Sequence, residues 1–184
     1  MKKILALLIF SFLFLAVKCP KPDNTKNQTP PAVLPPITQT GANTFGCLVN
    51  GRVWLPHQDH PNGSPNLESE YYKGYFTVTV LNNTDEGGAQ YVTWAYKSIY
   101  RLGTYYFKSA PGGGAPGAIY SNFLTNCQYY TNDQDSLNNY VTITRLDSVN
   151  RIISGNFSLY FLPSAGGCDT IKITSGRFDN VYTY

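Results

Sequence analysis

The 184-residue sequence contains little of what most enzyme sites and nucleic-acid interfaces require. It has two histidines, one methionine and only 14% charged residues. No stretch rich in lysine and arginine occurs, so we expect no electrostatic surface for nucleic acid. No window long enough for a helix repeats apolar side chains with a 3.6-residue period, which argues against long helices. These absences direct attention to β-rich folds that do not bind nucleic acid.

Recognisable catalytic motifs are also absent. The sequence has no G-x-S-x-G motif, and the glycine run 112–117 is followed by no Lys-Ser/Thr pair of a phosphate-binding loop. The three glutamates all fall in or beside expected loops: Glu68, Glu70 and Glu86. The two histidines lie in one loop, so no base is expected beside a cysteine nucleophile. We therefore predict a protein that is not an enzyme and needs no cofactor.

Two polar segments contain metal-ligating side chains but lack a ligand geometry. His57, Asp59 and His60 lie on a proline-rich loop, where their spacing fixes no coordination, unlike the histidines of an H-E-x-x-H helix. Residues 132–135 (Asn-Asp-Gln-Asp) alternate oxygen ligands, but the glycine and glutamate of an EF-hand loop do not follow. We predict no metal site.

The first eighteen residues have the pattern of a secretory signal. Lys2 and Lys3 form a charged start, and residues 4–17 are an apolar run too short to span a bilayer comfortably. Residues 15–19 (Leu-Ala-Val-Lys-Cys) resemble a bacterial lipobox, although lysine stands where a small residue is usual. The resemblance implies acylation of Cys19 and a stable membrane anchor. The alternative is ordinary signal cleavage nearby, with Cys19 free or removed.

Residues 19–43 are expected to form a disordered tether. Prolines recur among Asn, Thr, Gln and Lys, a composition that favours extended polyproline II over a packed core. The formal charge of +3 comes from Lys2, Lys3 and Lys18, because the remaining basic residues equal the 11 acidic ones. We expect an outer-membrane lipoprotein of the cell envelope. The periplasmic face is favoured over the cell surface because no acidic run follows Cys19.

Residues 44–184 are predicted to form one all-β domain. Apolar runs at 45–49 and 53–55 flank Asn50-Gly51, the strongest short signal for a β-hairpin. Period-2 alternation is clearest over 152–162, which we expect to pair with 140–146. Further strands are expected at 71–81, 90–100, 103–109, 126–131 and 170–182, the last bent at Ser175-Gly176, and 118–124 is ambiguous. Eight to ten short strands predict an antiparallel β-sandwich or a partly open barrel.

Several motifs resemble a family of Bacteroidota lipoproteins. They are the opening TGANTFGCLVNG at 40–51 with Val53-Trp54, the triplet Gly103-Thr104-Tyr105, Ile153-Ser154-Gly155-x-Phe157, and Ile173-Thr174-x-Gly176-Arg177-Phe178-Asp179. The family is a domain of unknown function without established catalytic residues. The resemblance therefore implies an envelope location and a β fold, and it implies no chemistry.

Three cysteines remain after Cys19. Cys47 alternates with Phe45 and Val49, so we interpret it as a buried apolar side chain. Cys127 and Cys168 each lie at a loop-to-strand junction, and an oxidising periplasm permits a disulfide between them. No C-x2-C pair suggests zinc.

Aromatic side chains are the one feature with binding potential, at 15% of the sequence. Six of them are candidates for stacking against a sugar or a partner: Tyr71, Tyr72, Trp94, Tyr96, Tyr105 and Tyr106. The alternative is that most of them fill the core or form cross-strand pairs. We hypothesise a non-catalytic binding module for a glycan or a protein. The alternative function is a structural subunit of a surface complex, assembled by strand addition at a sheet edge.

Overall fold

The computed structural model describes residues 32–58, 66–84, 88–107, 117–131, 137–163 and 167–184. The signal, Cys19, the tether up to residue 31, Asp59 with His60, and most of the glycine run lie outside the described residues, as does the segment 132–135. Within the described part, no helix is long and apolar enough to cross a membrane.

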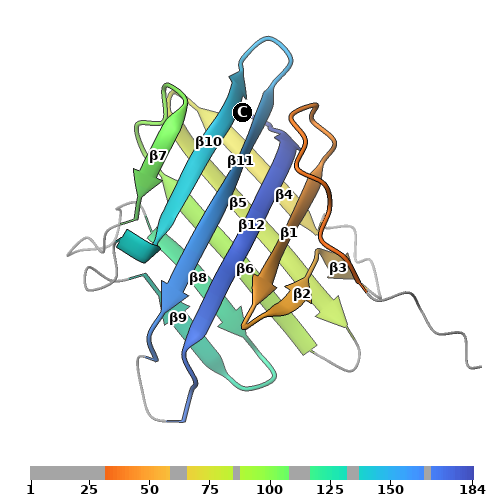
Figure 1. Cartoon of the computed structure of the whole chain (residues 1–184), viewed down its shortest axis with the longest axis vertical. Coiled ribbons are helices and arrows are strands. Elements are labelled where there is room, and N and C mark those ends of the chain that lie inside the picture. Colours follow the sequence, from red (N-terminus) through yellow and green to blue (C-terminus); the bar gives the residue numbers. More distant parts are fainter. Residues whose placement is uncertain (1–31, 59–65, 85–87, 108–116, 132–136, 164–166) are drawn as a thin grey trace, which may run out of the picture. The chain divides into compact units, whose positions relative to one another are not determined.

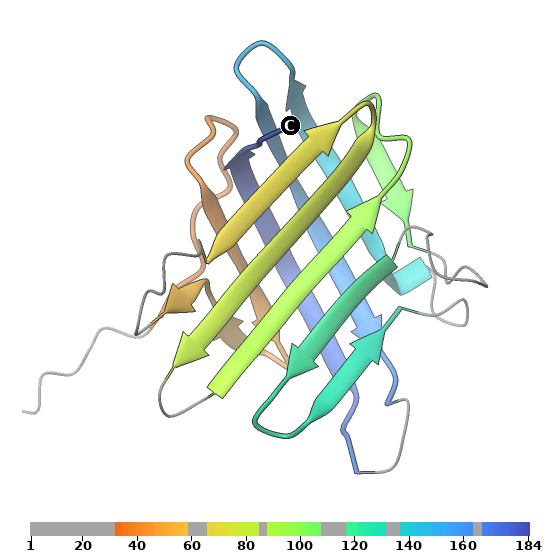
Figure 2. The same cartoon turned by 180° about the vertical axis from the view of Figure 1, so that it is seen from behind.

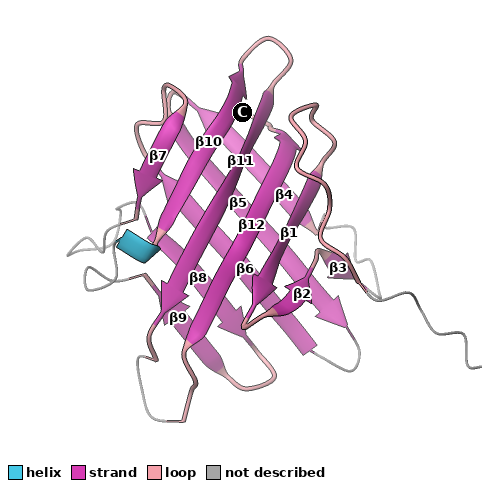
Figure 3. Cartoon of the chain, viewed as in Figure 1, coloured by secondary structure: helices cyan, strands magenta, loops and turns pink. Residues whose placement is uncertain are grey.

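The described residues form twelve strands. These strands make two facing sheets (Figures 1 and 2). Sheet A has the order β2 (Arg52–Trp54), β1 (Thr44–Val49), β12 (Ile171–Val181), β11 (Ile152–Phe161), β10 (Tyr140–Asp147) and β7 (Gly103–Tyr106). Sheet B has the order β3 (His57–Gln58), β5 (Tyr75–Thr84), β6 (Gly88–Tyr96), β8 (Gly117–Asn122) and β9 (Cys127–Tyr130), with β4 (Leu67–Tyr72) also paired to β5. Strands dominate the described residues (Figure 3). The predicted all-β class is confirmed, and the open sheets are those of a sandwich.

The first predicted hairpin is present. β1 and β2 pair across Asn50-Gly51, whose φ angles of 48° and 80° fit the mirror-image turn that Asn-Gly favours. Asn50 also joins the hairpin to the start of β12. Its side chain accepts a hydrogen bond from Lys172 N at 2.8 Å and donates one to Thr170 O at 3.1 Å.

A second hairpin was missed, because residues 71–81 were expected to form one strand. The chain instead turns at Lys73-Gly74, with φ angles of 47° and 83°, and β4 pairs with β5 from Leu67 to Tyr72. A lysine at a left-handed position is a weak sequence signal. The ring of Tyr100 covers the turn, and a Cβ on Gly74 would lie 2.5 Å from Tyr100 Cζ.

The inward face of each sheet follows the predicted alternation. Phe76, Val78 and Val80 on β5 are fully buried, and Trp94 on β6 packs with its ring centroid 4.8 Å from that of Phe76. The aromatic rings thus fill the space between the sheets, where their area contributes most to stability.

Two glycines and two phenylalanines interlock at the centre of sheet A. Gly155 pairs with Phe178, and Phe157 pairs with Gly176, across β11 and β12. A Cβ on Gly155 would lie 2.8 Å from Phe178 Cζ and 2.1 Å from Thr142 O. A Cβ on Gly176 would lie 2.6 Å from the ring of Phe157. Each glycine therefore makes room for the ring opposite, which explains why both motifs combine Gly with Phe.

The predicted bend at Ser175-Gly176 is a β-bulge within one continuous strand, β12. Ser175 has a φ of 52°, and the pairing register shifts on both sides, between Gly46 and Leu48 of β1 and between Phe157 and Leu159 of β11. The extra residue bends β12 without ending its pairing.

Residues 33–43, the N-terminal strap, contact the outer face of sheet A. Phe178 points into the core, so its neighbour Asp179 lies on the outer face, where the strap covers it to 1% exposure. The Asp179 carboxylate accepts hydrogen bonds from the strap at Thr38 Oγ1 (2.7 Å), Thr40 N (2.8 Å), Gly41 N (2.8 Å) and Ala42 N (3.2 Å), and from Ser154 Oγ (2.7 Å). The folded unit therefore begins before Thr44, where the sequence placed its boundary. The part of the predicted tether from residue 33 to 43 is bound to the sheet.

Among the described cysteines, Cys47 has its predicted role as a buried side chain, and the disulfide that the sequence left possible is present. Cys127 and Cys168 form a disulfide that joins β9 to the segment before β12. Cys47 is a free thiol with no exposed surface, and burial raises the pKa of this thiol. A neutral, buried thiol packs as a small apolar side chain.

Candidate functional site

The candidate site is a pocket of about 550 Å³ between the edges of the two sheets, here called the inter-sheet pocket. Sheet A contributes the β1–β2 hairpin and the start of β12, and sheet B contributes β5, β6 and β8. The described residues that line it are Val49, Asn50, Arg52, Val53, Trp54, Asn82, Gln90, Tyr120 and Ile171.

Strand alternation places amide side chains in this pocket. Asn82 continues the inward face of Val78 and Val80 on β5, and Gln90 continues that of Val92 on β6. The two amides oppose each other in the register of β5 and β6. Polar residues at inward positions are unusual, and here they mark the point where the apolar core gives way to the pocket.

Gln90 organises the polar groups of the pocket. Its Oε1 accepts a hydrogen bond from Trp54 Nε1 at 2.7 Å and another from Tyr120 OH at 3.3 Å. Asn82 Nδ2 donates to Leu55 O at 2.7 Å, which joins β5 to the chain after β2. Because Trp54 and Tyr120 are both buried, these bonds hold the Gln90 amide in one orientation.

The pocket has a neutral floor and one charged group. Burial raises the pKa of Tyr120 to about 12, and the nearby Tyr129 and Cys47 add to the shift. The Tyr120 hydroxyl is therefore a neutral hydrogen-bond donor at physiological pH. Among the described lining residues, Arg52 is the one that carries a formal charge. The site thus combines amides, an indole, a phenol and a guanidinium.

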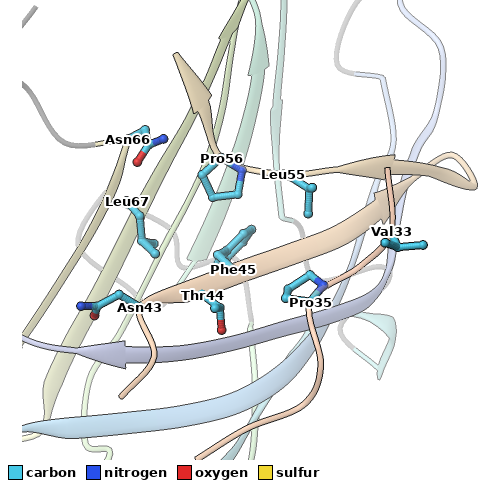
Figure 4. Close-up of a pocket in the computed structure, with 9 residues that line it drawn as sticks. All are labelled: Val33, Pro35, Asn43, Thr44, Phe45, Leu55, Pro56, Asn66 and Leu67. Atoms are coloured by element: carbon cyan, nitrogen blue, oxygen red, sulfur yellow. The ribbon is translucent and has the colours of Figure 1, made fainter. Parts of the chain in front are cut away.

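A second pocket of about 360 Å³ lies beside the N-terminal strap (Figure 4). Most of the side chains that line it are apolar: Val33, Pro35, Phe45, Leu55, Pro56 and Leu67. Asn43, one of its polar residues, already accepts a hydrogen bond from Val181 N at 2.8 Å. With fewer convergent polar groups, this pocket offers less to orient a ligand than the inter-sheet pocket does.

The six aromatic candidates do not form one surface. Trp94 is 1% exposed and contacts Phe76 and Phe178 in the core, so its predicted role in stacking is wrong. Tyr72 on β4 and Tyr106 on β7 are exposed, but they belong to different sheets.

The other three candidates are half-buried and pack within the fold. Tyr71 donates a hydrogen bond to Ile99 O at 2.7 Å, and Tyr105 donates one to Arg101 O at 2.6 Å. The ring centroids of Tyr96 and Tyr105 lie 5.2 Å apart. The structural alternative stated for these residues, cross-strand and core packing, describes them better than a ligand surface.

The residues that do line the inter-sheet pocket were not singled out from the sequence. From the sequence, Trp54 is only part of the first hairpin and of a family motif, and Gln90 is only the start of a strand. The available signal was an amide at an inward position of β5 and of β6. That signal can be recognised only once the inward face of each strand is known.

Metal binding gains no support in the described part of the chain, where no group of three His, Cys, Asp or Glu side chains comes together. His57 is on β3, and the other two metal-ligating side chains of that segment, Asp59 and His60, lie outside the described residues. Comparison with known proteins adds no candidate. No family model, no curated protein and no solved structure matches the chain.

Proposed function

We propose that this protein is a non-catalytic binding module that holds a glycan in the inter-sheet pocket. The observation that carries the proposal is the bridge through Gln90, whose single oxygen holds the Trp54 indole and the Tyr120 phenol together at the pocket. Preorganised polar groups lose little freedom on binding, which favours affinity.

The chemistry of the lining supports a sugar. The volume of about 550 Å³ lies within the usual range of small-molecule sites, about 300–1,000 Å³. Trp and Tyr each combine an apolar ring with a polar edge, and the Gln90 and Asn82 amides offer both donors and acceptors. A sugar presents the same mixture of apolar C–H faces and hydroxyl groups.

A binding role also fits the described lining better than a catalytic one does. Among the described residues that line the pocket there is no acid, histidine or cysteine. Tyr120, with its raised pKa, is a poor general base at neutral pH. The groups present can orient a ligand, and none of them is poised to move a proton.

The alternative, assembly by strand addition, has weaker support. The edge strands β2, β7 and β9 have three, four and four residues, and short edges pair poorly with an added strand. The longer edge of β4 is occupied, because Tyr71 N donates to Thr183 O and Thr183 N donates to Ser69 O, both at 2.9 Å.

The location is part of the same proposal. A charged start at Lys2 and Lys3, an apolar run and a lipobox-like segment before Cys19 support an exported protein with an acylated cysteine. We place it at the outer membrane, on the periplasmic face. Growth with labelled palmitate tests the acylation of Cys19: the wild-type protein should incorporate label and Cys19→Ala should not. Equal labelling of both would refute acylation at Cys19.

A glycan array with residues 20–184, which lack the signal and the anchor Cys19 and are called the mature chain below, tests the binding role. We expect at least one class of glycan to bind, and Gln90→Ala to weaken that binding because it frees both ring partners. Tyr106→Ala, which removes an exposed tyrosine of the opposite edge of sheet A, is the matched control. Binding to no glycan, or equal loss in both variants, would contradict the proposal.

A further inference from the structure

We infer that the ligand of the inter-sheet pocket is a sugar that carries a carboxylate, of the uronic-acid type. This inference rests on the proposed function and specifies its substrate class. The inference is drawn from two groups in the pocket that have no partner among the described residues: the positive charge of Arg52 and the amide N–H donors of Gln90.

The first observation concerns Arg52. Its guanidinium forms no ion pair or hydrogen bond with any other described residue, whereas two other arginines are engaged. Arg145 pairs with Asp147 at 2.7 Å, and Arg177 donates to Pro35 O at 3.3 Å. Arg52 is exposed at the pocket wall, and the described lining contains no acid to neutralise it. The pocket therefore presents an uncompensated positive charge.

The second observation concerns Gln90. Its oxygen already accepts two hydrogen bonds, from Trp54 and Tyr120. Both partners can only donate to it in this arrangement, so the amide nitrogen must point away from them. The two N–H groups of Gln90 Nε2 have no acceptor among the described residues. The pocket thus holds a second set of free donors.

Arg52 and Gln90 together offer donors without matching acceptors. A carboxylate is the natural complement, because it accepts hydrogen bonds at two oxygens and donates none. A guanidinium binds it through two parallel hydrogen bonds, which adds direction to the charge attraction. A neutral sugar would leave the charge of Arg52 without a counter-charge, and a cationic ligand would be repelled.

The rest of the lining favours a sugar over a simple organic acid. Asn82 uses its Nδ2 to hold Leu55 O, which leaves Oδ1 as an acceptor for a ligand hydroxyl. Val49 and Ile171 provide an apolar side. A ligand that matches all of these groups has a carboxylate, at least one hydroxyl and an apolar face.

Calorimetric titration of the mature chain with oligogalacturonate and with the neutral galactose oligomer of the same length tests the inference. We expect the acidic oligomer to bind at least about tenfold more tightly, and raised salt to reduce that preference. Galacturonic acid monomer, as a third arm, separates a site for a free sugar from one that needs a polymer. The control variant is Arg101→Gln, which removes an exposed arginine outside the pocket.

Three variants test which pocket residues produce the preference for the acidic oligomer. Arg52→Gln should remove the preference for the acidic oligomer. Because the Arg52 side chain is exposed, the variant should unfold at the same urea concentration as wild type, which separates lost binding from lost folding. Arg52→Lys should retain part of the preference for the acidic oligomer, because lysine keeps the positive charge but cannot form the two parallel hydrogen bonds of a guanidinium. Gln90→Glu should weaken acid binding by like-charge repulsion.

The outcomes separate this inference from the proposed function. Equal binding of both oligomers, or a preference that Arg52→Gln leaves intact, would overturn the inference while the binding role stands. Binding of neither oligomer or monomer, together with a blank glycan array, would overturn both.

Discussion

Gly41 N donates a hydrogen bond to Asp179 Oδ1 at 2.8 Å, although the two residues are 138 positions apart in the chain. Gly41 has a φ of 77°, and a Cβ there would lie 3.0 Å from both Ile152 and Val181. The opening motif and the tail motif of the sequence therefore meet at one carboxylate. This contact attaches the N-terminal strap to sheet A. The strap follows the proposed membrane anchor in the sequence.

Replacing Asp179 by Asn should release the N-terminal strap. The amide retains one acceptor oxygen but presents N–H groups to Thr40 N and Ala42 N, which cannot accept them. We expect a loss of about 2–4 kcal/mol in the free energy of unfolding, typical of a broken buried hydrogen-bond network. Hydrogen exchange should show faster exchange of the Thr40–Ala42 amides. Asp169→Asn, at an exposed aspartate, is the control and should change neither quantity.

Asp179 also predicts a dependence of stability on pH. Burial alone would raise its pKa, but hydrogen bonds from Ser154, Thr38 and the strap amides outweigh burial and hold the pKa below its ordinary value. A lowered pKa in the folded state contributes stability above the unfolded pKa, and this contribution is lost as pH falls toward the folded pKa.

Urea unfolding between pH 7 and about pH 2 measures this contribution. The difference in stability between wild type and Asp179→Asn should be constant near neutral pH and shrink below about pH 4. Asp147 has a lowered pKa too, through hydrogen bonds led by those from Asn150, so the comparison with the variant is needed to isolate Asp179. A difference that does not change with pH would refute the assignment.

The Cys127–Cys168 disulfide closes a loop with a sequence separation of 41. Loop-closure entropy predicts that it stabilises the fold by about 4 kcal/mol. The variant with both cysteines replaced by alanine should unfold at correspondingly lower urea, and a reducing agent should destabilise wild type but not the variant. Thiol titration of the mature chain should find no reactive group when folded and one, Cys47, when unfolded. Two further thiols in the unfolded, unreduced protein would contradict the disulfide.

Gly155→Ala tests the interlocked glycines and phenylalanines. The new Cβ would meet Thr142 O of the neighbouring strand at 2.1 Å, and backbone cannot move aside as a side chain can. We expect a loss of about 3 kcal/mol or more. Gly46→Ala is the comparison, because its Cβ would meet the ring of Pro35 in the strap at 2.6 Å. It should cost less and loosen mainly the strap; equal losses would contradict this account.

The fold class could be predicted from the sequence because its signals are local. Alternation over 152–162 and the Asn50-Gly51 turn follow from the period of a strand and the φ angles of one turn. The Lys73-Gly74 turn could not be predicted in the same way, because the covering ring of Tyr100 comes from a distant part of the chain.

The site was harder to predict than the fold. Abundant aromatics suggested a ligand surface, but packing between two sheets decides which rings remain accessible, and Trp94 lies in the core. The strap was mistaken for tether because its prolines resemble those before it. Its order depends on Asp179, which lies far away in the sequence.

The central claim is that ligand binds between the sheets at Gln90, and the two tryptophans of the chain allow a direct test. Trp54 lines the inter-sheet pocket, whereas Trp94 is buried in the core away from it. In a nitrogen–proton correlation spectrum, with the indole signals assigned by Trp54→Phe, we titrate oligogalacturonate into the mature chain. The account predicts that the Trp54 indole signal shifts progressively while that of Trp94 stays in place. Shifts confined to exposed tyrosines such as Tyr72 and Tyr106, with an unmoved Trp54 signal, would contradict it.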